Sequence, residues 1–336
     1  MKAIVLVGGF GTRLRPLTLS APKQLLPIGG VTMLERVVAK LGAAGVEEVV
    51  LSLGYQPDMF RSEFADARCA GVDLVYAVEP EPLDTAGAIA FAADAAGVSE
   101  RVLAVNGDVL SDLDIADLLA HHDRFGAAAT IALTPVEDPS RYGVVPLDDD
   151  GRVRAFIEKP EPGTAPSNWI NAGIYVLEPS VIQSIPRGRK VSIERETFPA
   201  LVGAGTLYAV QSDAYWIDAG TPAAFLQVHL DLLDGRRGTV ESGVDRTARV
   251  DADAKISRSF IGSGAVVAAG AEVIDSVVMA GVRIAHGARI ERSIIGARAL
   301  IGDGCEVTEL SVVGYDQDVD AGTILRAERL PGPDNW

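Results

Sequence analysis

Residues 6–18 read LVGGFGTRLRPLT and directly follow an apolar run that begins at Ala3. A glycine-rich turn after an apolar strand is typical of phosphate-binding loops in α/β proteins. The stretch is not a P-loop, because no Gly-Lys-[Ser/Thr] closes it. It is not a dinucleotide fingerprint either, because Leu14 stands where the third glycine belongs. The plainer alternative, a tight connection that binds nothing, stays open at this point.

The charge of this segment favours a ligand. The chain carries a net charge of −16, yet no Asp or Glu occurs between Met1 and Leu34. The cations of the segment are Lys2, Arg13, Arg15 and Lys23. A basic-only segment in an acidic protein is a candidate anion site. Backbone N–H groups, a guanidinium and an ammonium group together suit a triphosphate better than a dinucleotide pyrophosphate. Arg15 either binds the ligand or braces the loop through a carboxylate.

Short apolar runs and helix-like segments alternate along residues 1–235. The predicted strands are Ile4–Val7, Val49–Leu53, Leu74–Val78, Val102–Val105, Thr130–Thr134, Gly143–Pro146, Val153–Ile157 and Gly173–Leu177. The predicted helices begin at Thr32, with a capping-box spacing to Glu35, and cover Thr85–Ala96 and Ala223–Leu233. Such alternation predicts an α/β domain with a doubly wound, Rossmann-like parallel sheet over residues 1–235.

A 17-residue repeat follows a linker at residues 236–247. Aliphatic residues recur at this step in three series, with internal spacings of 6, 6 and 5 residues. One series is Ile256, Val273, Ile290 and Val307, and a Ser-x-[Ile/Val] motif begins at Ser259, Ser276 and Ser293 and returns one residue late at Ser311. The pattern predicts a triangular parallel β-helix of roughly four coils over residues 248–330. A small Greek-key domain is the alternative, but it rarely keeps such a register.

The motifs of residues 1–235 closely resemble those of the sugar-1-phosphate nucleotidyltransferases. They occur in the family's order: the opening stretch with Pro22-Lys23, Gly87, Asn106-Gly107-Asp108, Tyr142-Gly143, Phe156–Pro160, Asn171-Ala172-Gly173 and Trp216–Thr221. The resemblance is greatest to the mannose-1-phosphate guanylyltransferases, partly through Ser192–Pro199. The resemblance implies a left-handed, hexapeptide-repeat form of the β-helix, as in the longer members of the family.

The resemblance also implies a reaction. The phosphate of a hexose 1-phosphate attacks the α-phosphorus of an NTP, and pyrophosphate leaves. The second pKa of a phosphate monoester is about 6, so the nucleophile needs no general base. Catalysis then rests on positioning and charge neutralisation. By resemblance, Arg13 supports the triphosphate, Lys23 bridges the reacting phosphates, and Asp108 and Asp218 hold Mg²⁺, which favours few carboxylates plus phosphate oxygens.

Two sets of binding residues are carried over from the family. The implied nucleotide-binding residues are Val7, Gly8, Gly9, Gly11, Thr12, Arg13, Gln24, Glu79, Pro82, Thr85, Gly87 and Asp108. The implied sugar-phosphate-binding residues are Tyr142, Gly143, Glu158, Lys159, Asn171, Gly173 and Trp216.

Each of the main assignments has a structural alternative. Asp108 follows Asn-Gly and could be a turn residue. Asp218 could merely lead into the helix after Thr221, and Tyr142 could be a core residue. Glu158 and Lys159 could be a solvated surface pair, although Phe156-Ile157 before them and Pro160 after them favour a strand end.

The sequence gives opposing signals about the base. Lys-Gln-Leu-Leu-Pro after Pro22 is similar to glucose-1-phosphate thymidylyltransferases, in which the glutamine, here Gln24, contacts the base. Glu79 favours guanine, because an ionised carboxylate can only accept the hydrogen bonds of its N1–H and N2–H₂ edge. Leu83-Asp84-Thr85-Ala86-Gly87 departs from the family's Leu-Gly-Thr-Ala-Gly, which predicts a small backbone difference there. GTP with mannose 1-phosphate is the favoured pair, and a thymidylyl- or uridylyltransferase is the alternative.

Two other functions are weighed against this one. A non-catalytic, ligand-sensing subunit of the same fold is disfavoured by the intact set of Arg13, Lys23, Asp108 and Asp218. An acyltransferase β-helix needs more coils and a catalytic histidine, whereas His286 is the only histidine in the repeat and is expected on the surface.

Composition bounds the remaining possibilities. The negative net charge argues against non-specific nucleic-acid binding. No apolar run is long enough for a membrane span, and two distant cysteines, Cys69 and Cys305, suggest no disulfide framework. We therefore expect a cytoplasmic protein. The open strand edges of the β-helix need covering by the catalytic domain or by a second subunit, so a homo-oligomer is expected.

Overall fold

A computed structural model describes all residues 1–336 and divides the chain into two compact units. The first unit contains residues 1–9 and 34–216, and the second contains residues 10–33 and 217–336. The expected boundary near residue 235 therefore differs from this division, because the signature segment and the helix before the repeat group with the β-helix. None of the helices is long and apolar enough to span a membrane.

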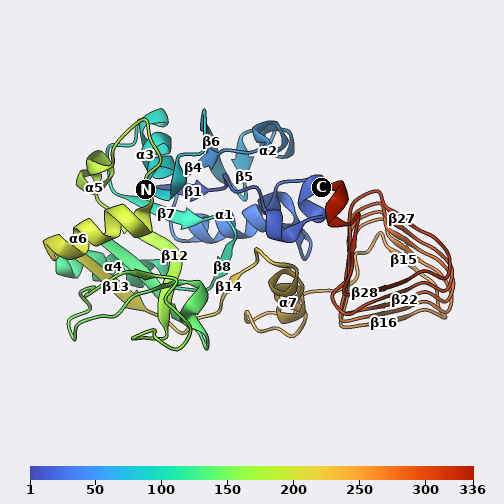
Figure 1. The fold of residues 1–336 in the computed structure, drawn as a ribbon. Helices are drawn as coiled ribbons and strands as arrows, with labels where there is room; N and C mark the ends of the chain where they lie inside the picture. The colour runs from blue at the N-terminus through green and yellow to red at the C-terminus, as the bar shows by residue number, and fades with distance from the viewer. The chain divides into compact units, whose positions relative to one another are not determined.

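The first unit is built on a ten-stranded mixed sheet (Figure 1). Its central strands β7, β1, β4 and β6 are parallel neighbours in that order. Beyond β7, strand β12 runs antiparallel to its neighbours β7 and β9, so the predicted parallel sheet is found in the central strands and the whole sheet is mixed. The strands are β1 (Lys2–Leu6), β4 (Glu48–Leu53), β5 (Arg68–Cys69), β6 (Val72–Val78), β7 (Val102–Asn106), β9 (Ala129–Pro135), β10 (Gly143–Val144), β11 (Ile157–Glu158), β12 (Trp169–Leu177) and β13 (Leu207–Gln211).

Helices pack on this sheet and complete its core. The alanine-rich α3 lies against β1, β4 and β6, and its small buried side chains permit a close approach to the sheet. Helix α4, which the sequence analysis did not predict, packs on β9, β12 and β13. The helices are α1 (Met33–Ala43), α2 (Pro57–Glu63), α3 (Asp84–Ala95), α4 (Ile115–Phe125), α5 (Pro179–Ser184) and α6 (Phe198–Ala204), the last preceded by a π-helical turn at Ile193–Thr197.

One predicted strand is largely wrong. Residues 153–157 form only an isolated bridge at Val153, and regular pairing begins at Ile157 in the short β11. The apolar residues of this stretch have another use, because Val153 is buried in the main core and Phe156 packs against it. The apolar residues that suggested a strand are instead single side chains buried from an irregular segment.

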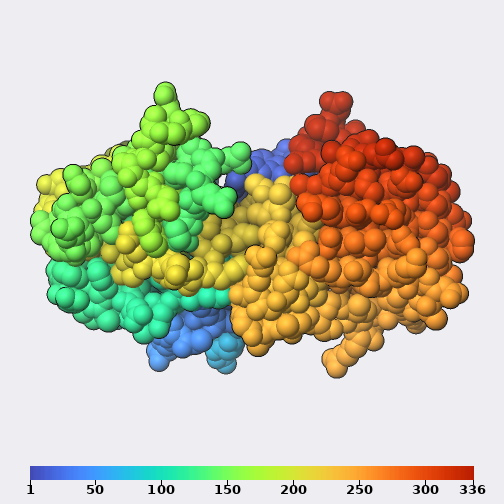
Figure 2. Space-filling model, turned by 90° about the horizontal axis from the view of Figure 1, so that it is seen from below, coloured from blue at the N-terminus to red at the C-terminus, as the bar shows by residue number.

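The second unit contains the β-helix (Figure 2), whose successive coils stack along its axis. Three parallel sheets of five strands form its sides, so the helix has five coils where roughly four were expected. The first side is β15 (Arg249–Val250), β18 (Val266–Val267), β21 (Arg283–Ile284), β24 (Leu300–Ile301) and β27 (Asp318–Val319). The second is β16 (Lys255–Ser257), β19 (Glu272–Ile274), β22 (Arg289–Glu291), β25 (Glu306–Thr308) and β28 (Ile324–Arg326). The third is β17 (Phe260–Ile261), β20 (Val277–Val278), β23 (Ile294–Ile295), β26 (Val312–Val313) and β29 (Arg329–Leu330).

The late return of the serine motif has a local cause. At the corresponding corners of earlier coils a single residue, such as Asp275 or Arg292, has a positive φ. In the fourth coil two residues, Glu309 and Leu310, have φ values of 58° and 65°. The extra residue is absorbed in the corner, so Ile295 pairs with Val313 and the inward-facing series continues without interruption.

The third side of the β-helix is apolar on both faces. The inner residues, such as Ile261, fill the core of the β-helix, while the outer residues Phe260, Val277, Ile294 and Val312 are buried as well. Helix α7 (Pro222–Leu233) covers part of this outer face, with the His229 ring edge-on to Phe260 at 5.1 Å between centroids. Residues of the hairpin β2 (Pro27–Ile28) and β3 (Val31–Thr32) line a small cavity with Val277 and His229. This packing explains why the signature segment groups with the β-helix.

Candidate active site

The predicted nucleotide-binding residues of the first unit gather at one edge of its sheet. Strands β1, β4, β6 and β7 are parallel, so their carboxyl ends lie at the same edge. Val7–Gly9, Gly54, Glu79 and Gly107-Asp108 directly follow these ends. The chain runs from β1 to β4 on one side and places β7 on the other, which makes this the switch point where open α/β sheets bind ligands.

Three glycines allow the loops at this edge to touch. A Cβ atom on Gly107 would lie 2.9 Å from the carbonyl oxygen of Leu6 and 2.8 Å from Val7. A Cβ on Gly54 would lie 3.2 Å from the carbonyl oxygen of Gly8. At Gly107 a side chain would force these atoms apart, and at Gly54 it would make an unusually tight contact. The half-buried Asp108 is therefore held next to the start of the signature loop.

The Glu79 carboxylate is fixed by two donors. The Ser52 hydroxyl donates to Oε1 at 2.9 Å, and the Leu83 N–H donates to Oε2 at 3.0 Å. A Cβ on Gly8 would lie 3.3 Å from Oε1, so the carboxylate faces the loop backbone. Each oxygen keeps one further lone pair for a ligand donor. Pro82, which lies between Glu79 and α3, is exposed.

The start of α3 explains the departure at Asp84. Asp84 has a φ of +62°, the left-handed region that glycine adopts without strain. Its carboxylate accepts the N–H of Thr85 at 2.8 Å, which stabilises a conformation that aspartate tolerates better than most residues. The predicted backbone difference from the family stays a prediction.

Thr85 and Gly87, the two predicted nucleotide-binding residues of this motif, pack against residues 191–194. Gly87 is buried, and its N–H donates to the carbonyl oxygen of Val191 at 3.1 Å. The Thr85 hydroxyl donates to Glu194 at 2.9 Å and accepts the N–H of Ile193. Their nucleotide contacts stay predictions, and the structure adds a packing role for both.

The predicted sugar-phosphate residues lie around β10, β11 and β12. Gly143 pairs with Glu158 across β10 and β11, and the Lys159 N–H donates to the Tyr142 carbonyl at 3.0 Å. The Lys159 ammonium lies 3.0 Å from the Glu158 carboxylate and is 62% exposed, so it is accessible to an anion. Tyr142 meets the Trp216 ring edge-on at 5.8 Å.

A bulge in β12 shapes the floor of this region. Gly173 has a φ of +75°, and a Cβ there would lie 2.6 Å from the Asn106 side chain. The Asn171 side chain accepts the Gly173 N–H and donates to the Tyr175 hydroxyl at 2.8 Å. The Trp216 indole donates to the Ala172 carbonyl. Asn171 and Gly173 thus lie next to the end of β7, the strand that Asp108 follows.

Sequence reasoning missed Glu194 as a site residue. Its Oε2 accepts hydroxyl groups from Thr85 at 2.9 Å and Ser192 at 2.8 Å. Burial, followed by the charge of Glu194, raises the pKa of the fully buried Tyr175 phenol. The Ser192–Pro199 motif was the available signal, but nothing in it shows that Glu194 meets Thr85, 109 residues earlier.

The second unit carries the rest of the signature loop. Gly11 has a φ of +61° and its carbonyl oxygen accepts the Thr18 hydroxyl at 2.8 Å, which closes the turn before the 3₁₀ helix Thr12–Leu14. The Arg13 guanidinium lies 3.4 Å from the Asp218 carboxylate, and the Gly220 N–H donates to the other Asp218 oxygen. Arg13 is 60% exposed, so it remains open to a phosphate.

Lys23 and Gln24 begin a 3₁₀ turn after Pro22. Lys23 is half-buried, whereas Gln24 is only 1% exposed and its Oε1 has no hydrogen-bond partner. Thr12 is exposed. A direct contact of Gln24 with a base stays a prediction. The Nε of Arg15 is likewise buried without a hydrogen-bond partner. Arg15 forms no ion pair with a carboxylate, so it does not brace the loop in the way that the sequence analysis offered as an alternative.

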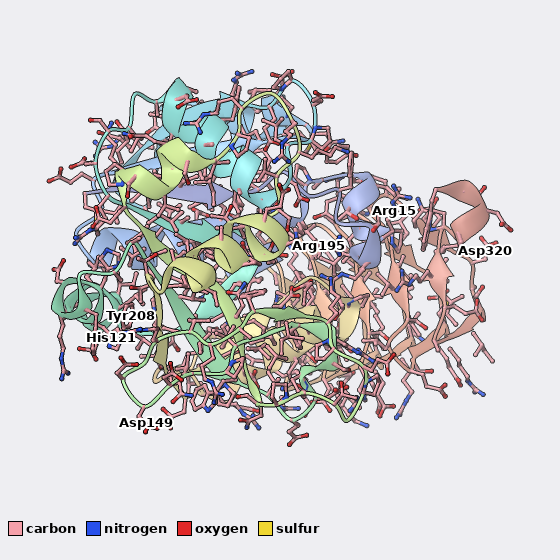
Figure 3. The ribbon with its side chains drawn as sticks, turned by 60° about the vertical axis from the view of Figure 1, so that its left-hand side comes forward. Arg15, His121, Asp149, Arg195, Tyr208 and Asp320 are labelled. Carbon is pink, nitrogen blue, oxygen red and sulfur yellow. The ribbon has the colours of Figure 1, made fainter.

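A wide cavity in the first unit is lined by none of the predicted site residues. It measures about 1120 Å³ and lies between the end of α4, the hairpin around Gly151 and the end of β13. His121 and Tyr208, labelled in Figure 3, both pack against the Phe125 ring, His121 tilted at 4.7 Å and Tyr208 stacked at 4.9 Å between centroids. His286 is exposed on the β-helix, as expected.

Comparison with known proteins shows the family of the chain. The family model described as nucleotidyl transferase matches residues 2–235, and a model described as GMPPB C-terminal domain matches residues 240–331. The chain belongs to the nucleotidyl transferase family. The resemblance predicted from the motifs is confirmed, as is the fold of a Rossmann-like domain followed by a parallel β-helix.

Two relatives and one solved structure show how close the likeness is. The chain is 42% identical to mannose-1-phosphate guanylyltransferase of Mycobacterium tuberculosis, over 83% of this chain and 80% of the relative. It is 39% identical to mannose-1-phosphate guanylyltransferase 1 of Arabidopsis thaliana, over 84% of this chain and 82% of the relative. Crystalline HddC from Yersinia pseudotuberculosis complexed with GMP-PN matches with a TM-score of 0.59 and 29% identity, over 68% of this chain and 97% of HddC.

Proposed function

We propose that this nucleotidyl transferase condenses GTP with mannose 1-phosphate to give GDP-mannose and pyrophosphate. The observation that carries the proposal is the edge of the first unit's sheet, where Val7–Gly9, Glu79 and Asp108 converge through glycine contacts. The two relatives that are 42% and 39% identical to this chain are named mannose-1-phosphate guanylyltransferases, which supports the choice of substrates.

The reaction requires two anions to meet, and the side chains present suit that task. The exposed Arg13 neutralises the triphosphate and the leaving pyrophosphate. Lys23 bridges the reacting phosphates, and the exposed Lys159 binds the phosphate of the sugar. Glu158 pairs with Lys159 and holds it in place. A phosphate monoester is already largely dianionic at neutral pH, so none of these residues acts as a base.

Nucleotidyltransferases of this family generally use a divalent metal. We propose Mg²⁺, with Asp108 and Asp218 as the carboxylates that hold it. Both side chains offer only hard oxygen ligands, and Mg²⁺ commonly takes one or two carboxylates beside substrate phosphates. Bound there, the ion supplies charge neutralisation at the phosphates.

Glu79 gives the proposal its base preference. Its carboxylate is fixed by Ser52 and Leu83 and can only accept hydrogen bonds from a base. Guanine offers N1–H and N2–H₂ donors, whereas thymine and uracil would oppose acceptor oxygens to the carboxylate. A mismatch of about 2 kcal/mol corresponds to roughly thirtyfold discrimination.

One experiment tests the function. Pyrophosphate release is measured for GTP, dTTP, UTP, ATP and CTP, each with mannose 1-phosphate and glucose 1-phosphate, with Mg²⁺ and with excess EDTA. We expect GTP with mannose 1-phosphate to give the highest kcat/KM, at least roughly tenfold above dTTP and UTP, and EDTA to abolish turnover. The variant Glu79→Gln should narrow the gap between GTP and dTTP. Equal or better use of dTTP by the unmodified enzyme would instead establish the thymidylyltransferase alternative, and no turnover with any pair would favour a ligand-sensing subunit.

A further inference from the structure

Glu194 is a half-buried carboxylate with an unusual set of partners. Its Oε2 accepts both the Thr85 and the Ser192 hydroxyl, while no arginine or lysine pairs with either oxygen. Buried carboxylates are normally paired with a cation or fully hydrogen-bonded. Glu194 therefore has one oxygen saturated by neutral donors and one oxygen with acceptor capacity left.

The orientation of this carboxylate is fixed from both sides. The Ser192 hydroxyl that donates to Glu194 also accepts the Arg195 N–H at 3.2 Å. The Thr85 hydroxyl accepts the Ile193 N–H at 2.9 Å while it donates to Glu194. Residues 193–197 form a π-helical turn, on which Figure 3 labels Arg195. Such turns are rare in proteins, and those that occur are often found at functional sites. The start of α3 and the turn at residues 192–195 thus clamp each other around one carboxylate oxygen.

Tyr175 contacts both the segment that follows Glu194 and the predicted sugar-phosphate residue Asn171. The Tyr175 hydroxyl accepts the Asn171 amide at 2.8 Å inside the core. The Tyr175 ring meets the ring of Phe198, four residues after Glu194, edge-on at 5.3 Å between centroids. The segment that carries Glu194 therefore packs on the same tyrosine that binds Asn171. The charge of Glu194 adds to the burial that raises the pKa of this phenol.

We propose that Glu194 accepts a hydrogen bond from a ring hydroxyl of the hexose and so helps to select the sugar epimer. The inference rests on the proposed function, since it needs a sugar in this region. A hydroxyl is the matching ligand because an ionised carboxylate only accepts and a hydroxyl can donate. A site built to bond a hydroxyl discriminates strongly against an analogue that places it elsewhere, since its buried polar group is then left unpaired.

The test compares epimers. Glu194→Gln keeps the size of the side chain and an acceptor for Thr85 but removes the charge. With GTP saturating, kcat/KM for mannose 1-phosphate should fall at least roughly tenfold, and the ratio between mannose 1-phosphate and glucose 1-phosphate should change by about fivefold or more. The KM for GTP should stay within about twofold. Glu196→Gln is the matched control, because that carboxylate is exposed and pairs with Arg189; it should leave all three quantities unchanged.

A purely structural role would give a different pattern. If Glu194→Gln lowers the melting temperature and reduces kcat/KM for both sugars equally, or if it changes nothing, the proposal is wrong. Glu194→Asp is the second variant should the first not fold, and the epimer ratio is again the deciding quantity. The unmodified enzyme tests the proposed function separately, and if it prefers another hexose 1-phosphate the ratio is measured against that sugar and its epimer.

Discussion

Asp84 illustrates how a single residue departs from a motif without disturbing it. A glycine is usual at this position, and the structure shows why, because φ is +62°. The aspartate remains because its carboxylate accepts the Thr85 N–H and offsets part of the cost of the left-handed conformation. The sequence showed the departure but not the backbone angle that gives it meaning.

We predict that Asp84→Ala lowers the free energy of unfolding by about 1–2 kcal/mol, because alanine pays the left-handed cost and loses the hydrogen bond. Asp84→Gly should be as stable as the natural protein or more so, since glycine adopts this φ freely. Urea denaturation of both variants measures the difference. Asp84→Asn, which also tolerates the conformation and keeps an acceptor, is the control and should lie close to the natural protein. An alanine variant as stable as the glycine variant would contradict this account.

At the scale of elements, a column of buried serines organises one corner of the β-helix. Ser276 accepts the N–H of Ser293 at 3.1 Å and donates to the Ile274 carbonyl at 2.7 Å. Ser259 and Ser276 repeat the same contacts one coil earlier. Each serine therefore supplies the acceptor for a buried N–H of the next coil and adds a second donor to a carbonyl of its own coil.

Ser276→Ala should cost about 1–3 kcal/mol of unfolding free energy, because it leaves the buried Ser293 N–H without its partner, whereas the Ile274 carbonyl still accepts the Arg292 N–H. Denaturation monitored by circular dichroism would measure the loss. Ser257→Ala is a suitable control, since that serine lies on the same β-helix with an exposed side chain, and its midpoint should stay within experimental error. Equal effects of the two substitutions would refute the proposed role of the column.

The periodic elements were the most predictable part of the fold. Short-range patterns, the 17-residue step and the strand–helix alternation, predicted the β-helix and the central parallel strands, because each coil or strand repeats the same burial. Long-range contacts were not predictable in this way. The doublet Val277-Val278 indicates that both faces of a strand are buried, but no local pattern identifies α7 and the signature segment as the cover. The contact of Thr85 with Glu194 was missed for the same reason.

At the scale of the whole molecule, the end of the chain returns to its beginning within the second unit. Arg329, in the last coil, donates from its guanidinium to the Arg15 carbonyl at 3.0 Å. A Cβ on Gly314, which directly follows β26, would lie 3.3 Å from Pro16, so this end of the β-helix packs directly against the signature loop. The same loop carries Arg13, two residues before the bonded carbonyl. The β-helix thus braces the segment that is proposed to hold the triphosphate.

We therefore predict that Arg329→Ala impairs catalysis although Arg329 belongs to the β-helix. A hydrogen bond from a charged group contributes about 1.5–3 kcal/mol, and a loop held less rigidly positions Arg13 less well, so kcat/KM for GTP should fall roughly tenfold. Arg326→Ala is the matched control, because Arg326 lies on the preceding strand β28 and pairs only with the half-buried Glu306. Steady-state kinetics with GTP varied at saturating sugar phosphate would measure both variants, and their melting temperatures would separate a loosened loop from general unfolding. If the two arginine variants lose activity equally, or if Arg329→Ala stays fully active, bracing of the loop by the last coil does not contribute to catalysis.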